Sequence, residues 1–308
     1  MIIDPGEIFS AKHREPYDER FLKSGIPMAS LCFNNRFAWS LDKYYYFNIL
    51  EDLACLYCEG EQGITSKHIV LPLGDISPDA LRKIADHYYP EFKAEGLPLR
   101  MMYVPDSLLE TVCGIEGYEA VVVHKTDYDE YVYDAASLID LRGKALKAKK
   151  NQLNHFHRDC NVCAYHTLTP ADMDECLKLA EEWCISKGVD KMDVMNSDYI
   201  PIRIIFENFG KLRIRGGLLR LYNKVIAFSI GSEPLDGTGF VHFEKADQTI
   251  AGTNVAVISK VTSNEYSDVR YINREEDMGI EGLRNAKKSL EPVFMTAKND
   301  VFLTKKGG

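Results

Sequence analysis

The sequence predicts an α/β protein of two domains, each built on a mixed sheet that is covered by helices. The first indication is length, because 308 residues exceed the usual size of a single domain, and two domains of about 150 residues are expected. The second is the alternation of short apolar runs with amphipathic segments along the chain, which is typical of a sheet with helices packed on it. The hydrophobic content of 45% and charged content of 27% are ordinary for a globular protein.

The composition excludes several classes of protein. No apolar run approaches the roughly 18 to 20 residues that a membrane helix needs. Residues 1–16 lack the basic and apolar regions of a signal peptide, so we expect a cytoplasmic protein. The net charge of -9 argues against a general nucleic-acid coat, although it allows a local basic groove.

Two cysteine pairs have a spacing that metal sites use, Cys55 with Cys58 and Cys160 with Cys163. About 100 residues separate the pairs, whereas zinc ribbons place theirs about 15 to 20 apart. Histidines near the second pair leave a zinc site as the less favoured alternative. We therefore expect all eight cysteines to be free thiols and expect no metal.

The second half of the chain has the clearest pattern of elements. Thr169 and Pro170 have the residue types of a helix N-cap and first turn, and Asn223-Lys224 separates two apolar runs like the turn of a hairpin. The expected order is strand, two helices, three strands, helix, strand, helix, strand, which is the element order of the GNAT acyltransferase fold. The expected strands are 161–169, 216–222, 225–234, 237–247, 269–273 and 293–304, and the expected helices are 170–188, 198–212, 253–266 and 279–290.

The first half has a similar but less regular rhythm, so two related domains in tandem are expected. The clearest helix is 77–96, where Ser77 can cap and Pro78 can occupy the first position. The other expected elements are strands at 37–41, 54–60, 68–74, 99–105 and 119–125 and a helix at 106–114. We predict an N-terminal domain over 1–140, a basic connecting helix over 141–159 and a C-terminal domain over 160–308.

The connecting helix is the most basic stretch of the chain. It is either a solvated linker or a groove for phosphate groups, and the second reading is favoured by clustered lysines in an otherwise acidic protein. Lys149 and Lys150 are the candidate contacts to a tRNA under the second reading.

Three segments carry a resemblance to a known family: "DLRGKALKAKKNQLNHF" (140–156), "HFEKAD" (242–247) and "YINREEDMGIEGLRNAKKSLEP" (271–292). They resemble the C-terminal catalytic domain of phosphatidylglycerol lysyltransferase, which is similar to the Fem-type aminoacyltransferases. The resemblance implies a tandem GNAT-like acyl-CoA N-acyltransferase fold and transfer of an acyl or aminoacyl group to an amine or hydroxyl. Full-length lysyltransferases carry membrane helices before this domain and this sequence shows none, so its substrate need not be a lipid.

Polar residues at the ends of two expected strands are the candidate catalytic groups. Glu244 follows His242 on one face of the strand 237–247, and it is the first candidate for a general base or an amine anchor. If the strand 269–273 continues its alternation, Glu275 and Asp277 share a face and are the other catalytic candidates. The alternatives are an edge strand with solvated charges and an Asp277 that only caps the following helix.

Asp247 joins these three carboxylates as a candidate substrate-binding residue. Four converging carboxylates suit the recognition of a cationic amine, and their repulsion raises the pKa of one of them toward that of a useful base. Asn273 and Arg284 are further candidate substrate-binding residues, although Arg284 has a surface ion pair as its alternative.

The loop before the helix 253–266 is where GNAT enzymes hold the phosphates of coenzyme A. Gln248 and Gly252 match the family's pattern and are candidate binding residues, but the spacing is one residue longer and Thr253 or Asn254 replaces the second small residue. Thr253 is alternatively a plain helix cap. No cofactor is assigned, and the candidate donors are aminoacyl-tRNA and acyl-CoA.

The preferred hypothesis is thus a tandem GNAT-like transferase that moves an aminoacyl or acyl group to a small amine or hydroxyl acceptor. An acyl-CoA-dependent N-acetyltransferase is the alternative enzyme. A non-catalytic protein that binds a small ligand or a tRNA is the alternative outside enzymes.

Overall fold

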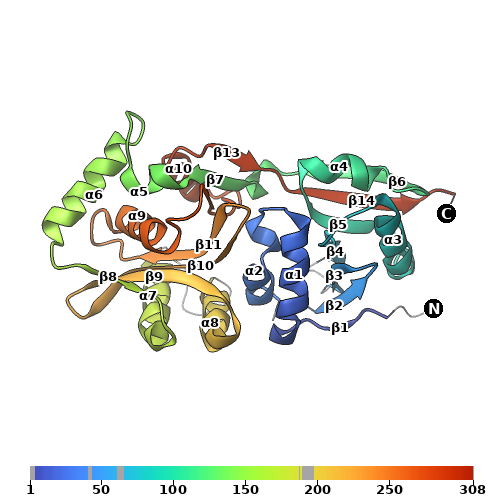
Figure 1. The fold of residues 1–308 in the computed structure, drawn as a ribbon, viewed down its shortest axis with the longest axis horizontal. Coiled ribbons are helices and arrows are strands. Elements are labelled where there is room, and N and C mark those ends of the chain that lie inside the picture. Colours follow the sequence, from blue (N-terminus) through green and yellow to red (C-terminus); the bar gives the residue numbers. More distant parts are fainter. Residues whose placement is uncertain (1–3, 41–43, 61–65, 187, 189–197, 308) are drawn as a thin grey trace. The chain divides into compact units, whose positions relative to one another are not determined.

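A computed structural model describes residues 4–40, 44–60, 66–186, 188 and 198–307. The chain divides into two compact units (Figure 1). The first comprises Met1–Glu130 together with Thr296–Gly308, and the second comprises Tyr131–Met295. Each unit contains a mixed seven-stranded sheet, so the predicted fold class of two α/β domains with mixed sheets is confirmed.

The first sheet has the strand order β1-β2-β3-β4-β5-β14-β6. Ser77 accepts a hydrogen bond from the Ala80 amide and Pro78 is the first helical residue, which is the helix start that the sequence predicts. The strands of this unit are β1 (Glu7–Ile8), β2 (Tyr45–Leu50), β3 (Leu53–Cys58), β4 (His68–Val70), β5 (Leu99–Val104), β6 (Tyr118–His124) and β14 (Asn299–Lys305), and its helices are α1 (Arg14–Ser24), α2 (Phe33–Ala38), α3 (Pro78–Lys93) and α4 (Asp106–Cys113).

The second sheet has the order β13-β7-β12-β11-β10-β9-β8. Helices α7 and α8 cover one face, while α5, α6 and α9 lie on the other (Figure 1). Its strands are β7 (Glu130–Asp134), β8 (Ala164–Thr167), β9 (Ile214–Leu221), β10 (Lys224–Leu235), β11 (Thr238–Ala246), β12 (Tyr271–Asn273) and β13 (Phe294–Thr296), and its helices are α5 (Ala135–Asp140), α6 (Lys147–Asp159), α7 (Met173–Ser186), α8 (Tyr199–Glu207), α9 (Thr253–Glu265) and α10 (Glu281–Lys288).

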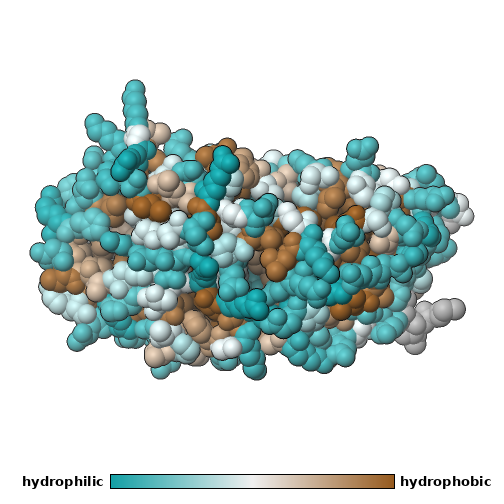
Figure 2. Space-filling view, viewed as in Figure 1, coloured by the Kyte–Doolittle hydropathy of each residue, from teal (hydrophilic) through white to brown (hydrophobic). Residues whose placement is uncertain are grey.

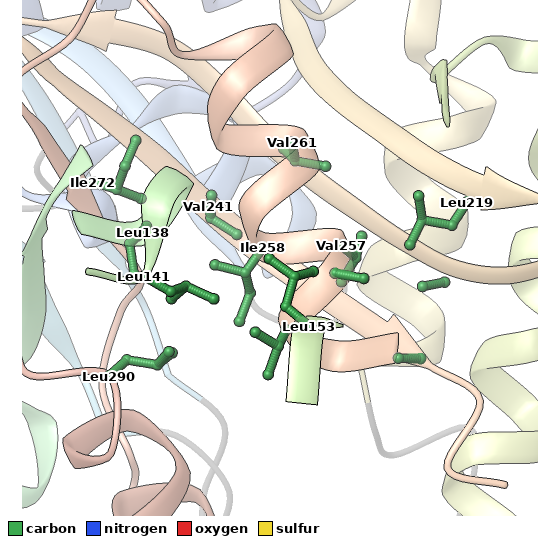
Figure 3. Packing of buried hydrophobic residues seen from close by; sticks show 14 of the residues in the cluster. Leu138, Leu141, Leu153, Leu219, Val241, Val257, Ile258, Val261, Ile272 and Leu290 are labelled. Carbon is green, nitrogen blue, oxygen red and sulfur yellow. The ribbon is translucent and has the colours of Figure 1, made fainter. Parts of the chain in front are cut away.

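Helix α9 is the centre of the apolar core of the second unit. Figure 3 shows Ile258 of α9 on the side of that helix where Leu138 of α5 and Leu153 of α6 lie, and all three side chains are buried. Burying one such side chain contributes about 1.5–3 kcal/mol, so these contacts fix α6 against α9. The basic helix is therefore part of the second unit rather than a free linker.

The structure corrects three predicted elements. Residues 33–38 form α2, so the strand expected at 37–41 is wrong over its described part. The long strand expected at 269–273 is the three-residue β12. The strand expected at 293–304 is two strands, because β13 joins the second sheet while β14 inserts between β5 and β6 of the first.

The last strand also changes the domain boundaries. The predicted domains were 1–140 and 160–308, whereas the units change over at Glu130 to Tyr131 and again at Met295 to Thr296. The physical reason is pairing, since β14 makes ladders with both β5 and β6 and so completes the first sheet from the far end of the chain.

Candidate active site

Strands β11 and β12 pair only at their beginnings. They run parallel, with Thr238 to Phe240 opposite Tyr271 to Asn273, and β11 then continues to Ala246 while β12 ends. The backbone pairing of the two strands therefore ends at Asn273. Beyond that point, polar side chains of β11 meet those of the loop after β12. The candidate site lies where these strands separate.

A bulge in β11 sets the direction of His242. Ile230 of β10 pairs with Phe243 while Gly231 pairs with Val241, so His242 is the extra residue and has no partner in this register. Such bulges redirect a side chain next to a site. The alternation that the sequence predicts for 242–247 is thus interrupted at its first residue.

His242 lies in a chain of three polar side chains. Its Nε2 is 2.7 Å from the Ser232 hydroxyl, and its Nδ1 is 2.7 Å from Glu275 Oε1. Because an ionised carboxylate only accepts, Nδ1 carries a proton, and in the neutral imidazole Nε2 accepts from the Ser232 hydroxyl. The His242 side chain is fully buried, whereas 18% of the Glu275 side chain is exposed, so Glu275 is the solvent-facing end of the chain.

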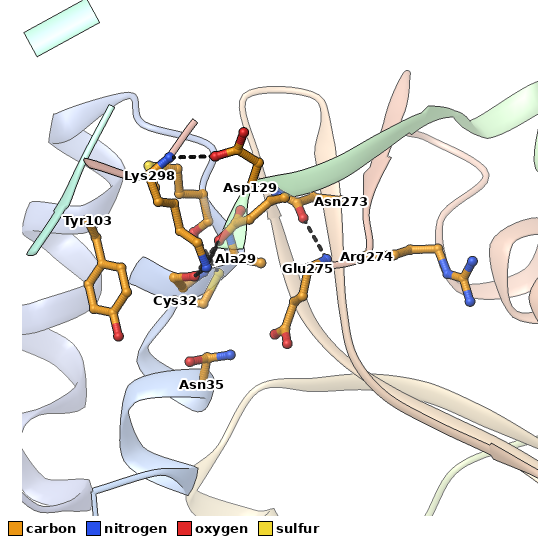
Figure 4. Close-up of polar contacts among 12 residues, drawn as sticks. Ala29, Cys32, Asn35, Tyr103, Asp129, Asn273, Arg274, Glu275 and Lys298 are labelled. Atoms are coloured by element: carbon orange, nitrogen blue, oxygen red, sulfur yellow. Dashed lines mark hydrogen bonds and ion pairs between the residues drawn. The ribbon is translucent and has the colours of Figure 1, made fainter. Parts of the chain in front are cut away.

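A strained turn presents Glu275. Its backbone has a φ of 58°, in the left-handed region that few non-glycine residues adopt. The Asn273 side-chain oxygen accepts a hydrogen bond from the Glu275 amide at 3.0 Å (Figure 4). The turn sends Arg274 and Glu275 to opposite sides, as Figure 4 shows, so the predicted alternation does not continue past the end of β12.

The buried ammonium group of Lys287 fastens the same turn from α10. It donates to the carbonyl oxygens of Arg274 and Glu275, the second at 3.1 Å. Burial, together with the nearby positive charge of Arg274, lowers the pKa of Lys287 to about 8. Lys287 was not among the candidate residues from the sequence, because lysine is rarely buried.

Glu244 is held by Arg274. Glu244 Oε2 accepts from Arg274 Nε at 3.1 Å and from Nη2 at 2.7 Å, and the guanidinium also lies over the ring of Tyr133. Both partners are largely buried, with 17% of the Glu244 side chain exposed. Glu244 is therefore paired with Arg274, whereas Glu275 is bonded to His242.

Asp277 has the most extensive set of bonds among the four carboxylates. It accepts from the Tyr131 hydroxyl at 2.6 Å, from Arg284 Nε and Nη2 at 2.9 Å each, and from the Gly279 amide at 2.8 Å. The bonds from Arg284 hold the pKa of Asp277 far below its usual range, despite the opposing effect of burial. This carboxylate stays ionised and is fully engaged in holding the start of α10.

Asp247 lies apart from the other carboxylates in its contacts. It accepts from the Thr249 amide and hydroxyl, which closes the turn after β11, and it pairs with Lys224 at 3.4 Å. Each of the four carboxylates thus has its own partner: Arg274 for Glu244, Lys224 for Asp247, His242 for Glu275 and Arg284 for Asp277. Gln248 donates to the Ala246 carbonyl within the same turn.

The N-cap residue of α9 packs against α6. Gly252 is the N-cap, with a φ of 83°, and a Cβ atom added there would lie 2.5 Å from the Gln152 carbonyl oxygen of α6. A helix N-terminus binds phosphate only where its amides are reachable. Here a carbonyl oxygen of a neighbouring helix lies against the position where GNAT enzymes hold coenzyme A phosphates.

The lysines most exposed on α6 and its lead-in are not the two that the sequence singled out as contacts to a tRNA. Lys150 is half-buried and donates to the Asp140 carbonyl at 2.9 Å, and burial and the charge of Arg274 lower the pKa of the half-buried Lys149. Figure 2 shows hydrophilic residues over the region where Figure 1 places α6. The exposed polar face of this helix and its lead-in is formed by Lys144, Lys147, Asn151, Asn154, His155 and Arg158, the last four of which line a shallow pocket.

Neither cysteine pair takes part in a metal-like cluster within the described residues. Cys55 and Cys58 are buried in β3, and Cys160 follows the end of α6. All eight cysteines are free thiols, as predicted. Over the same described part of the chain, no helix is long and apolar enough to cross a membrane.

Comparison with known proteins identifies the family. Residues 33–298 match the family model for the C-terminal domain of phosphatidylglycerol lysyltransferase. The chain belongs to this family. The membership confirms the resemblance seen in the sequence and places the chain among transferases.

Several solved structures share the fold of this family member. A conserved protein of unknown function from Bacteroides thetaiotaomicron VPI-5482 is 27% identical, with a TM-score of 0.87 over 98% of this chain and 100% of that one. The C-terminal domain of a putative lysylphosphatidylglycerol synthetase from Agrobacterium fabrum is 13% identical, with a TM-score of 0.63 over 95% and 92% of the two chains. FemX is 8% identical, with a TM-score of 0.64 over 95% and 96%. These last two likenesses concern the fold, and they agree with the predicted resemblance to the lysyltransferase domain and the Fem-type proteins.

A curated relative is more distant in sequence. The uncharacterized protein MYCGA3080 of Mycoplasmoides gallisepticum is 22% identical over 241 residues, which are 69% of this chain and 76% of that protein. It adds no substrate to the comparison.

Proposed function

We propose that this protein transfers an aminoacyl group from an ester donor, such as aminoacyl-tRNA, to a small amine or hydroxyl acceptor. Family membership supports transfer chemistry, and the packing of α6 against the N-cap of α9 supports an ester donor over coenzyme A. The closeness of the Gln152 carbonyl to Gly252 is the observation that carries this choice, because a carbonyl oxygen beside that helix end disfavours a pyrophosphate there.

In this proposal Glu275 accepts the proton of the nucleophile. The acceptor nitrogen or oxygen forms a bond to the acyl carbon, the ester bond to the donor breaks, and the proton passes from Glu275 to the departing hydroxyl. Glu275 is favoured over Asp277 because its carboxylate is partly exposed. The bonds to Asp277 lower its pKa so far that it is a weak proton acceptor. Glu244 is a less favoured base, because two bonds from Arg274 occupy one of its oxygens.

His242 and Ser232 are assigned as positioning residues. Both are buried: His242 bonds to Glu275 and Ser232 bonds to His242, so they act on Glu275 rather than on a substrate. Asn273 and Lys287 hold the backbone of the turn that carries Glu275, and Asn273 therefore contributes to the site through the turn.

The exposed face of α6 is the proposed surface for the RNA part of the donor. Lys144, Lys147 and Arg158 are exposed, and phosphate binding by such a face weakens steeply with salt. Lys149 and Lys150, the residues expected from sequence, are proposed to contribute less, because both are half-buried and Lys150 is already bonded to Asp140.

The deciding experiment compares donors. The protein is incubated with a panel of radiolabelled aminoacyl-tRNAs or with acyl-CoA thioesters, each with the same small amines and hydroxyl compounds. We expect label to move from RNA to an acceptor and not from acyl-CoA. Turnover of acyl-CoA would refute the donor assignment, and RNA binding without any turnover would favour the binding-protein alternative.

Two sets of variants sharpen the assay. Glu275→Gln is expected to reduce transfer by about 100-fold or more, as loss of a general base does, while Asp268→Asn on the surface serves as its control. The pair Lys144→Glu and Lys147→Glu is expected to weaken RNA binding by about tenfold or more and to reduce its salt dependence. Lys178→Glu with Lys211→Glu, two exposed lysines elsewhere in the second unit, is the matched control.

A further inference from the structure

Three arginines of the first unit are buried, and two of them have carboxylate partners. Arg14, Arg20 and Arg36 are 7%, 8% and 8% exposed. Arg14 pairs with Asp18 at 2.9 Å, and Arg20 pairs with Asp52. Among the described residues, no carboxylate lies within 4.0 Å of Arg36.

The partners of Arg36 are neutral and do not use all its donors. Nη1 donates to the Tyr103 hydroxyl at 3.1 Å and Nη2 donates to the Asn35 side-chain oxygen at 2.7 Å. The Nε–H group is buried and has no hydrogen-bond partner. A guanidinium has five N–H donors and remains charged, so this group keeps both a positive charge and an unused donor in a buried setting.

Tyr103 shows a second unusual feature at the same place. It has a φ of 64° although it is not glycine, and such strain is retained where the surrounding structure requires it. Its ring lies 4.6 Å from the Arg36 guanidinium and 5.6 Å from Lys298 Nζ. In Figure 4 the phenol points from β5 toward α2, which carries Asn35. Tyr103 is only half-buried, so this side chain is itself in contact with solvent.

We propose that Arg36, with Asn35 and Tyr103, binds an oxyanion: a carboxylate or phosphate group of a small molecule. A side-on oxyanion accepts from Nε and Nη2 together, which is the two-bond geometry that arginine forms with carboxylate and phosphate groups. The bound anion supplies the counter-charge that Arg14 and Arg20 obtain from Asp18 and Asp52. A buried charge without a counter-charge is unfavourable, and this unit otherwise pairs its buried arginines.

The test measures thermal unfolding of the full chain in the presence of inorganic phosphate, acetate or glycerol phosphate. Each is compared with chloride at equal ionic strength. We expect a rise of roughly 5 °C for the wild type at saturating anion, since a ligand that binds only the folded state stabilises it. Phosphate also stabilises proteins in general, so the readout is the difference between the wild type and Arg36→Gln.

Arg36→Gln is expected to lose at least tenfold in anion affinity, and Arg36→Lys to lose less because it keeps the charge. Arg20→Gln is the matched control, as it removes an equally buried arginine that has a carboxylate partner. It should lower the melting temperature and leave the anion response unchanged.

The behaviour without anions adds an independent measurement. Arg36→Met should melt no lower than the wild type in anion-free buffer, because it removes an uncompensated charge. A larger rise in melting temperature with glycerol phosphate than with inorganic phosphate would show that the natural ligand is a larger molecule that carries the anion. Equal rises would show that it is a free anion. The site is upheld in both cases. Equal responses of the wild type and Arg36→Gln to every anion would overturn the proposal. Binding is measured without donor or turnover, so it does not depend on the transferase assay.

Discussion

Replacing Asp277 by asparagine should destabilise the second unit. The side chain is 2% exposed and accepts hydrogen bonds from Tyr131, from Gly279 and from Nε and Nη2 of Arg284. These bonds join β7, the loop after β12 and the first turns of α10. The substitution changes almost no volume, so its effect isolates the charge and the acceptors.

The size of the effect follows from the partners. Asparagine keeps one oxygen, which can still accept from Gly279 and from Arg284 Nη2, but its NH₂ group cannot accept from Arg284 Nε or from Tyr131. A hydrogen bond to a charged group contributes about 1.5–3 kcal/mol, and the bond from Arg284 Nε is worth less than that here, because 34% of the arginine side chain is exposed to water. We expect a total loss of about 2–4 kcal/mol in the free energy of unfolding.

Urea unfolding followed by tryptophan fluorescence measures this loss. The chain has two tryptophans, Trp39 in the first unit and Trp183 in α7 of the second. In a Trp39→Phe background the signal reports on the second unit alone, which matters because two units need not unfold together. Asp268→Asn, at a side chain that is 65% exposed, should change the unfolding free energy by less than about 0.5 kcal/mol.

An unfolding midpoint of the Asp277→Asn protein equal to that of the wild type would contradict this expectation. That outcome would show that Arg284 and Tyr131 lose nothing by being separated from the carboxylate. A large loss of transfer activity at unchanged stability would instead return Asp277 to the catalytic role that the sequence suggested.

Three further predictions concern the same unit. Because its pKa is depressed in the folded state, Asp277 stabilises the protein above pH about 4 to 5, and the difference between wild type and Asp277→Asn should shrink as the pH falls to about 3 in urea titrations. Gly252→Ala should lower the free energy of unfolding by about 1–3 kcal/mol, because the positive φ is unfavourable for alanine and the added carbon would lie 2.5 Å from the Gln152 carbonyl oxygen. Gly282→Ala, in open space on α10, should raise it by roughly 0.5–1 kcal/mol. Equal effects of the two substitutions would refute the contact between Gly252 and α6. His242→Gln should lower the rate of transfer by about tenfold or more with donor affinity unchanged, and an altered pH profile of the rate is the sign that a merely structural histidine would not give.

Several features of the fold could be predicted from the sequence because they depend on neighbouring residues. Ser77 with Pro78 and Thr169 with Pro170 indicated two helix starts that the structure contains. The hairpin of β9 and β10 followed from two apolar runs around a short turn. Local capping and periodicity were sufficient in these cases.

The pairing of the last strands and the element at residues 37–41 could not be predicted from the sequence. Nothing local indicates that residues 293–304 divide between two sheets, because strand pairing is decided by partners such as β5 and β6, nearly 200 residues away. The strand predicted at 37–41 failed for a related reason. Its aromatic residues fit a strand by propensity, but they pack as the helix α2 against other aromatic rings, including Phe9.

At the candidate site, the residue types could be read from the sequence: an acidic strand end, a following loop rich in carboxylates and a basic helix. Their partners depend on the tertiary structure. A bulge turned His242 toward Glu275, a left-handed turn sent Arg274 to Glu244, and α10 placed a buried lysine beneath both. The physical reason is that a carboxylate's role depends on the charges and donors within a few ångströms of it, and these come from elements that are distant in the chain.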